Sequence, residues 1–469
     1  MKIPFGEFAP DSATINTEYA SIADNVIAGA TGYYSIPNAG AVDHTCGAEV
    51  TSAVDIKIGL NELTIAGGGS KIYVDGNECQ KVGLSSISSN IFNEYIVWGD
   101  DLIIFGSPTP PQKISATDLA TLGTNKTSNL AGSPPSAKTA AKVREFLVAG
   151  NTTESSIDYR NRVRWSSFEN PEAWTAGTNQ SDYQDLTIGG DVMRVVGGEY
   201  GIIFQREGIT RMTYVGSPLI FQFDPIDGAA GTFSPESVVV VGSDIYYLGT
   251  DGFYVLRSFT SSERIGANKV DRWFFETAGG GSDGLELERV KGVYDRRSGV
   301  IFWSFRTSAQ NLNTPNNKII AYNLKTNKWS TLTFDNTCLV SSYEEANEIG
   351  ADDALKPFVL SYFNASNQYL SLSGSGTLSA TLETGEFGGE RFTEITEVRP
   401  LVDGVTTVTT KTRNTLSGSV TSVGPTSTDS SGKANVRTNA RYTRLECVTT
   451  GAFTEATGVE IKVRQGAAR

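Results

Sequence analysis

The sequence has little of the chemistry that many enzymes and metal sites use, because it contains a single histidine, His44. A Ser-His-Asp triad would depend on that one residue, and an H-E-x-x-H metalloprotease or a multi-histidine zinc site needs more than one. His44 stands next to Asp43 in a Gly- and Ala-rich stretch. We interpret it as an ordinary loop residue.

Cysteine is also scarce, and its spacing excludes the common metal modules. The sequence contains no C-x-x-C pair, which argues against a zinc or iron–sulfur site. Four cysteines in 469 residues are too few for a disulfide scaffold. We expect free, buried thiols and assembly in a reducing cytoplasm. The four residues are Cys46, Cys79, Cys338 and Cys447.

Long apolar runs are missing as well. The N-terminal residues lack the charged start and apolar core of a signal peptide. No apolar run approaches the roughly 18 residues of a membrane span. We therefore expect no membrane insertion.

Positive charge is in deficit, since 39 basic and 52 acidic residues give a net charge of −13. Residues 371–469 contain 11 basic and 10 acidic residues, so residues 1–370 contain 28 and 42. Stable binding of nucleic acid depends on clustered Lys and Arg. The composition therefore argues against it.

Glycine and strand-forming residues are plentiful. The chain has 49 glycines and only 19% charged residues, with many Val, Ile, Thr, Tyr and Phe. This composition is typical of short strands joined by tight turns. It favours a folded, mainly β protein.

Strand-like units recur along the chain, starting near residues 55, 91, 143, 191, 237 and 291. Their mean spacing of about 47 residues is typical of β-propeller blades. One unit alone leaves the faces of its sheet exposed, whereas radial stacking buries them. We predict a β-propeller of five to seven blades, with six favoured. Two packed sandwiches would give similar strands without so regular a period.

Changes in composition suggest three parts. We place an N-terminal arm at residues 1–45, the propeller at 46–345 and a C-terminal β domain at 346–469. Strands rich in Thr, Ser and Val begin after residue 370, and the stretch 404–437 is low in charge. We expect that stretch to form an exposed hairpin or a projecting loop.

Glycosidases use a pair of carboxylates as acid and base, and two pairs in this sequence have the required residue types. They are Glu383 with Glu386 and Asp182 with Asp185. Nothing in the sequence places either pair across a sugar, and the Ser-x-Asp-x-Gly-x-x-x-Trp box of sialidases is absent. The glycine-rich residues 67–70 lack the lysine of a phosphate-binding loop and predict a hairpin turn. We expect no catalytic, cofactor-binding or metal-binding residues, no cofactor and no enzymatic activity.

Several stretches follow one pattern in order along the chain. They are Pro4-Phe5-Gly6-Glu7-x-x-Pro10-Asp11, Ala23-x-Asn25-Val26, Gly32-Tyr33-Tyr34-x-x-Pro37, Asn161-Arg162-Val163-Arg164-Trp165-Ser166 with Glu169-Asn170-Pro171-x-x-Trp174, Asp251-Gly252-Phe253-Tyr254, Arg264-Ile265-Gly266, Val270-Asp271-Arg272-Trp273-Phe274-Phe275, Tyr442-x-Arg444-Leu445 and Thr457-Gly458-Val459-Glu460-Ile461-x-Val463-Arg464. Together they resemble the tail nozzle family of short-tailed bacteriophages, also called tail tubular protein B or head-tail stabilisation proteins. The resemblance thins out over 107–141 and 404–437.

This resemblance implies a structural virion protein of the phage tail, assembled in the host cytoplasm. The resemblance implies a propeller-bearing protein that, like members of the tail nozzle family, forms a homohexameric tube below the portal and adaptor rings. The implied partners are other copies of the chain, the adaptor or head–tail connector ring, and tail fibres or other appendages. Double-stranded DNA would pass transiently and without sequence preference. We expect the arm, over residues 1–40, to add to a neighbouring subunit or to the adaptor.

Two other readings remain open. A receptor-binding or polysaccharide-degrading propeller would need an exposed carboxylate pair or a row of aromatic residues in an open pocket. A cellular scaffolding propeller with kelch-like blades would have similar repeats.

Overall fold

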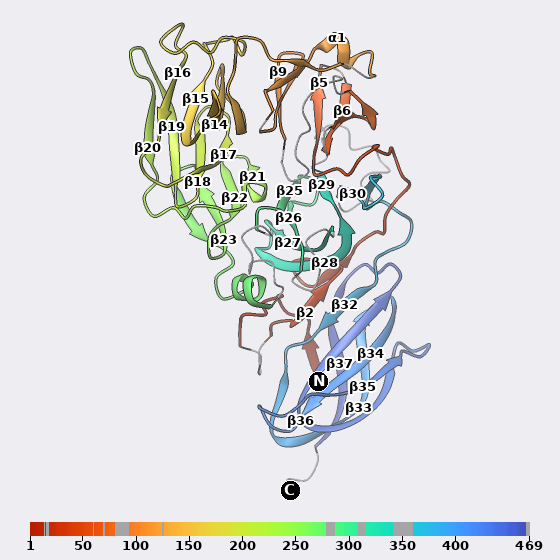
Figure 1. Ribbon diagram of the computed structural model, residues 1–469. Helices are drawn as coiled ribbons and strands as arrows, with labels where there is room; N and C mark the ends of the chain where they lie inside the picture. The colour runs from red at the N-terminus through yellow and green to blue at the C-terminus, as the bar shows by residue number, and fades with distance from the viewer. Residues whose placement is uncertain are drawn as a thin grey trace.

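Short strands and tight turns build a ring of small sheets in this protein, and longer strands build a second β part below it (Figure 1). The computed structural model describes residues 1–465 except 14, 16–17, 60, 69–70, 80–92, 108, 124–125, 278–286, 308–314 and 341–359. The short helices in this part of the chain are α1 (Ala116–Leu119), the 3-10 turn η1 (Pro235–Ser237) and the π-helical turn η2 (Trp273–Thr277).

Five units of the ring are separate antiparallel sheets of four strands each, which follow one another along the chain. Their strands are β5 (Ser52–Ile58), β6 (Asn61–Gly68), β7 (Lys71–Val74), β8 (Asn77–Glu78), β9 (Glu94–Trp98), β10 (Asp101–Phe105), β11 (Gln112–Ile114), β12 (Ser128–Asn129), β13 (Ser136–Val143), β14 (Phe146–Glu154), β15 (Ile157–Trp165), β16 (Asp182–Asp185), β17 (Val192–Val196), β18 (Gly201–Gln205), β19 (Ile209–Gly216), β20 (Ile220–Pro225), β21 (Val239–Val241), β22 (Asp244–Leu248), β23 (Phe253–Arg257) and β24 (Ser261–Arg264).

Two further units complete the ring. One has the strands β25 (Lys291–Asp295), β26 (Val300–Phe305), β27 (Asn316–Asn323) and β28 (Lys328–Asn336), which form one end of a 14-stranded sheet. The other is a separate three-stranded sheet of β29 (Cys338–Val340), β30 (Ser361–Phe363) and β31 (Tyr369–Ser371). Strand β25 contacts β21 on one side and β29 on the other, and β29 contacts β5.

An apolar core fills each space between neighbouring units. Ile65 and Leu102 belong to the core between the first two units, and Ala66 and Phe363 to the core between the last and the first. Corresponding clusters lie at the other five junctions. Radial packing thus buries both faces of each small sheet, which is how a propeller stabilises strands of five residues.

The predicted fold is confirmed: the protein is mainly β, with a β-propeller, an N-terminal segment and a C-terminal β domain. Six small sheets stand apart from the large sheet, and β25–β28 takes its place among them in the ring. The sequence period located the first six units. It did not reveal the last sheet, because each of its strands has only three residues.

The chain closes the ring by pairing its beginning with its end. Residues 40–46 run along the outer edge of β31, where the amide of Asp43 donates to the Tyr369 carbonyl at 3.1 Å and the amide of Tyr369 to the His44 carbonyl at 2.9 Å. The amide of Cys46 donates to the Asn367 carbonyl at 2.9 Å. These bonds give the last sheet a fourth, outer segment from the N-terminal side of the chain.

Long strands form the C-terminal domain. They are β32 (Ala380–Glu383), β33 (Phe387–Val402), β34 (Val405–Arg413), β35 (Thr421–Ser427), β36 (Ala434–Thr450) and β37 (Ala456–Gln465). The expected boundary at residues 345 and 346 lies outside the described residues, but β29 and β31 on either side of it belong to one sheet. The propeller therefore extends to about residue 371.

The stretch 404–437 is integrated into this domain. Strand β34 pairs with β36 from Val405 to Arg413, and β35 then forms a hairpin with β34. Strand β35 is exposed along most of its length. The stretch is therefore an edge hairpin of the sheet, and not a loop that projects from it.

The N-terminal segment joins the two parts instead of leaving the molecule. Its strands are β1 (Lys2–Pro4), β2 (Ile22–Asp24), β3 (Val26–Ala28) and β4 (Tyr33–Ser35). Strand β2 lies between β28 of the ring and β32 of the C-terminal domain, as Figure 1 shows, while β1 pairs with β37. Phe5 and Phe8 are buried. The apolar side chains of this segment are thus buried against distant parts of its own chain.

Candidate functional site

The first pair of candidate carboxylates is buried in ion pairs inside the C-terminal domain. Glu383 is 1% exposed and accepts hydrogen bonds from Lys411 and from Arg444. Glu386 is 2% exposed and is held by both arms of the Arg413 guanidinium, with Nε 2.7 Å from Oε1. Each carboxylate is turned toward cations of its own sheet. The pair is therefore structural.

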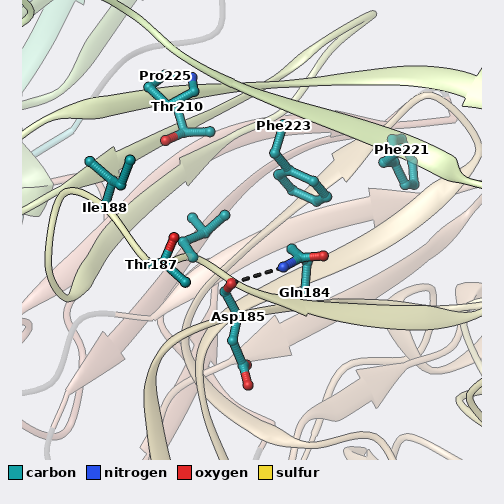
Figure 2. A pocket seen from close by; sticks show the side chains of 9 residues that line it. Gln184, Asp185, Thr187, Ile188, Thr210, Phe221, Phe223 and Pro225 are labelled. Carbon is teal, nitrogen blue, oxygen red and sulfur yellow. Dashed lines mark hydrogen bonds between the residues drawn. The ribbon is translucent and has the colours of Figure 1, made fainter.

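The second pair lies on β16, at the outer edge of the third unit. Asp185 binds Arg162 through two hydrogen bonds, of 2.7 Å to Nε and 2.9 Å to Nη2, and these hold the pKa of Asp185 below its usual value. A cavity of about 410 Å³ lies beside it, lined by Leu186, Phe221 and Phe223 among others. Figure 2 shows that the Asp185 carboxylate points away from these aromatic rings. The cavity thus lacks an acid–base pair.

His44 lies in the segment that closes the ring, not in a free loop. Its ring stacks on Tyr369 with centroids 4.9 Å apart, and Nδ1 is 2.9 Å from Asp43 Oδ2. The neighbouring Asp55 accepts hydrogen bonds from the hydroxyls of Tyr369 at 2.7 Å and Thr64 at 2.8 Å. This arrangement joins the first sheet to the last and gives His44 a structural setting. The four cysteines are free and buried, as predicted.

Burial raises the pKa of Asp55 to about 6, although the two hydroxyl donors and the nearby His44 oppose the shift and Asp75 adds to it. The ordinary pKa of an aspartate is 3.8. Between that pH and about pH 6, the folded protein therefore holds a proton at Asp55 that the unfolded chain has lost. We expect the contribution of Asp55 to the free energy of unfolding to fall by about 3 kcal/mol as the pH rises from about 4 to about 6, at 1.36 kcal/mol per pKa unit.

Urea denaturation of wild type and Asp55→Asn at a series of pH values measures this contribution. The variant should lose this downward slope, because asparagine does not titrate. Its amide can still hydrogen-bond to both hydroxyls, accepting from one and donating to the other. Asp158→Asn, at an exposed position of β15, is the matched control and should keep the wild-type slope. Equal slopes for wild type and Asp55→Asn would contradict the prediction.

Four charged side chains converge where the inner strands meet. Glu94 begins β9, Arg194 lies in β17, Glu236 lies in η1 before β21, and Lys291 begins β25. Arg194 Nη2 lies 3.5 Å from Glu94 Oε2, and Nη1 lies 3.4 Å from Glu236 Oε1. Lys291 Nζ binds the other oxygen of Glu236. We call these four residues the axial cluster.

The axial cluster is largely buried, and its charges depend on one another. Burial favours the neutral acid at Glu236, but Lys291 and Arg194 more than offset this and hold its pKa below the usual value. At Glu94, burial dominates and raises the pKa. The pKa of both cations is raised, because the carboxylates outweigh the effect of burial. The cluster ties four units of the ring together through balanced charge.

A second set of contacts joins the N-terminal segment to η2. The carboxylate of Asp11 accepts hydrogen bonds from the backbone N–H groups of Arg272 at 2.6 Å and Trp273 at 2.7 Å. Phe8 packs edge-on against the Trp273 ring at 5.3 Å, and Lys269 Nζ donates to Glu7 Oε1 at 2.7 Å. This junction is built by residues some 260 positions apart in sequence.

A network of ion pairs lies next to this junction. Arg264 binds Asp271 at 2.6 Å and Asp251 at 2.9 Å, and Asp271 also accepts the backbone N–H of Phe253 at 3.0 Å. Phe253 in turn packs against Phe274, with centroids 5.1 Å apart. The motifs at 251–254, 264–266 and 270–275 therefore meet in one place.

Sequence reasoning did not identify the axial cluster. Its members are separated by 100, 42 and 55 residues, so no local spacing reveals them. The one available signal was a charged residue at the start of an inner strand, as at Glu94 and Lys291.

Comparisons with known proteins give distant structural similarities. No protein family and no curated protein matches the sequence. The extracellular domain of the putative one-component system BT4673 from B. thetaiotaomicron is 9% identical with a TM-score of 0.43, covering 78% of this chain and 41% of that one. PorZ, a surface component of the type-IX secretion system of Porphyromonas gingivalis, is 12% identical with a TM-score of 0.35, covering 73% of this chain and 38% of that one. The chain thus spans about two-fifths of the length of either protein.

No helix among the described residues has the length and apolar character needed to cross a bilayer.

Proposed function

We propose that the protein is a non-enzymatic subunit of a short phage tail, which forms the nozzle as a homohexameric ring below the adaptor. In this role it assembles in the host cytoplasm, becomes part of the virion tail, continues the DNA channel for genome retention and ejection, and carries tail fibres or other appendages. The resemblance of its sequence motifs to the tail nozzle family is the origin of this proposal.

The observation that supports it most is the spatial convergence of those motifs. Asp11, from the N-terminal motif, caps η2 in the motif at 270–275, and Phe5 donates its backbone N–H to the carbonyl of Thr457 in the C-terminal motif at 3.1 Å. Contacts of this kind need not involve chemistry, since they fix the propeller to the C-terminal domain. A fixed two-part body suits a structural subunit, and heterologous contacts between identical subunits close into a ring when the rotation between them allows it.

The predicted copy number is six. Native mass spectrometry of purified tail complexes, or electron microscopy of the chain assembled on its adaptor, measures it. We expect a ring with six-fold symmetry, and another copy number in the tail complex would contradict the proposal. A monomer in isolation would not contradict it, because such rings can need their template to form. Genome neighbours that encode portal and adaptor proteins would support the assignment independently.

DNA passage gives a second test. Residues 1–370 carry 28 basic and 42 acidic residues, and a lining with few cations neither neutralises phosphates nor resists sliding. We expect no measurable affinity for a labelled duplex near physiological salt, as measured by fluorescence anisotropy on the assembled ring. Tight binding that weakens steeply with added salt would show a basic lining instead.

The alternative is a receptor-binding or polysaccharide-degrading propeller. Three carboxylates of the two candidate pairs, Glu383, Glu386 and Asp185, form ion pairs with lysine or arginine. These ion pairs argue against a polysaccharide-degrading enzyme. Incubation of the protein with capsular polysaccharide or lipopolysaccharide tests it, and shortening of the chains would favour this alternative over the nozzle.

A further inference from the structure

The inner strands of the ring leave a polar cavity beside the axial cluster. Its volume is about 180 Å³, and it is lined by the four charged residues together with Asn93, Tyr95, Ala53, Gly292 and three valines. The lining comes from β5, β9, β17, η1 and β25, which belong to five different units. Because β5, β9 and β25 contribute residues at or near their first positions, the cavity lies toward the end of the ring where these inner strands begin.

One buried polar group in the cavity lining lacks a partner. Asn93 is 5% exposed, and its amide nitrogen lies 3.3 Å from Ser52 Oγ, whereas its amide oxygen has no hydrogen-bond partner among the described residues. Leaving a buried acceptor unsatisfied costs about 1–3 kcal/mol, so native proteins seldom do so without water or a ligand. A hydrogen-bond donor held in the cavity that Asn93 lines would satisfy this oxygen.

The charge of the cavity selects the class of occupant. Two carboxylates face two cations, and each charged group has a partner of opposite sign. The four charges sum to zero, so an ion that enters gains no net attraction to offset the loss of its own hydration. A neutral molecule avoids that cost and can still hydrogen-bond to the oxygens of Glu94 and the nitrogens of Arg194 and Lys291. Val54, Val238 and Val293 add an apolar wall.

We propose that this cavity binds a neutral polyhydroxylated molecule of about the size of one sugar ring. Hydroxyl groups donate and accept, so they match a lining that offers both kinds of partner, and the C–H face of such a ring packs on the valine wall. The volume equals that of several water molecules, which is room for a single ring. The proposal is independent of the nozzle assignment, because the cavity belongs to one chain.

Saturation-transfer NMR on the full chain tests this with neutral monosaccharides such as glucose, galactose, mannose, rhamnose and N-acetylglucosamine. Glucuronate and glucosamine serve as charged counterparts of the same size. We expect at least one neutral sugar to bind better than its charged counterparts. No binding by any neutral sugar, or preferential binding of a charged one, would overturn the proposal. An oligosaccharide that ends in the preferred sugar separates the two sources: its binding shows that a terminal glycan residue can enter, and its failure restricts the site to free sugars.

Two variants locate the binding in the cavity. Val54→Trp fills the space without removing a charge and should abolish the signal, while Asn93→Ala should weaken binding by about tenfold, the effect of one lost hydrogen bond. Val405→Trp, on an exposed position of β34, is the matched control and should bind as wild type does. Thermal melting establishes which variants are folded, and Asn93→Ala keeps the test decisive if the tryptophan variant is not. Unchanged binding in a folded Val54→Trp, or in Asn93→Ala, would show that the sugar binds elsewhere.

Discussion

Replacement of Glu236 by glutamine should lower the free energy of unfolding by about 3–5 kcal/mol, which is the usual cost of breaking a buried ion pair on one side. Glu236 is 4% exposed and is the carboxylate that Lys291 and Arg194 share. Glutamine keeps the shape but removes the charge, so two cations are left with Glu94 alone. Burial already disfavours the ionised form of Glu94, so it compensates poorly. Chemical denaturation measures the loss.

Two comparisons separate this effect from general sensitivity to mutation. Glu263→Gln removes an exposed partner of Arg257 and should cost less than about 1 kcal/mol. The double variant Glu236→Gln with Lys291→Met removes one charge of each sign and keeps the pair of Arg194 and Glu94. It should be more stable than Glu236→Gln alone, since a balanced pair replaces an excess of buried positive charge. The explanation fails if Glu236→Gln costs no more than Glu263→Gln.

Truncation of Phe253 to alanine should cost about 3–5 kcal/mol as well, through the loss of packing and not of charge. Phe253 is fully buried, and its ring lies 5.1 Å from Phe274, 5.0 Å from Trp303 and 5.2 Å from Trp329. Phe253 begins β23, and its ring packs against η2 and the unit β25–β28. A cavity at this position therefore weakens the packing of all three. The loss should appear as a lower midpoint in urea denaturation.

Phe168→Ala is the matched control for this variant. Phe168 is 42% exposed, so most of the area that it loses was already in contact with water, and we expect a cost of about 1 kcal/mol or less. A Phe253→Ala protein that is as stable as Phe168→Ala would mean that the aromatic group can collapse around the missing ring.

Local sequence signals accounted for much of the ring but not for its closure. Alternating strands and turns at regular spacing are a property of neighbouring residues, so six of the units could be located from them. The last sheet has three strands of three residues, and its fourth segment comes from residues 40–46, more than 300 positions away. Such a pairing leaves no periodic trace, because hydrogen bonds between distant backbones do not constrain the intervening sequence.

The sequence by itself determined that this protein is mainly β, that its strands form repeated units, and that its cysteines are buried and free. Each of these follows from composition, from spacing or from the hydrophobicity of single residues. Tertiary structure alone decided that residues 1–37 join the ring to the C-terminal domain, that Glu383, Glu386 and Asp185 are held in ion pairs, and that the axial cluster exists. Burial and charge pairing are properties of three-dimensional neighbours. Glu94, Arg194, Glu236 and Lys291 become neighbours only when β9, β17, η1 and β25 converge from four units of the ring.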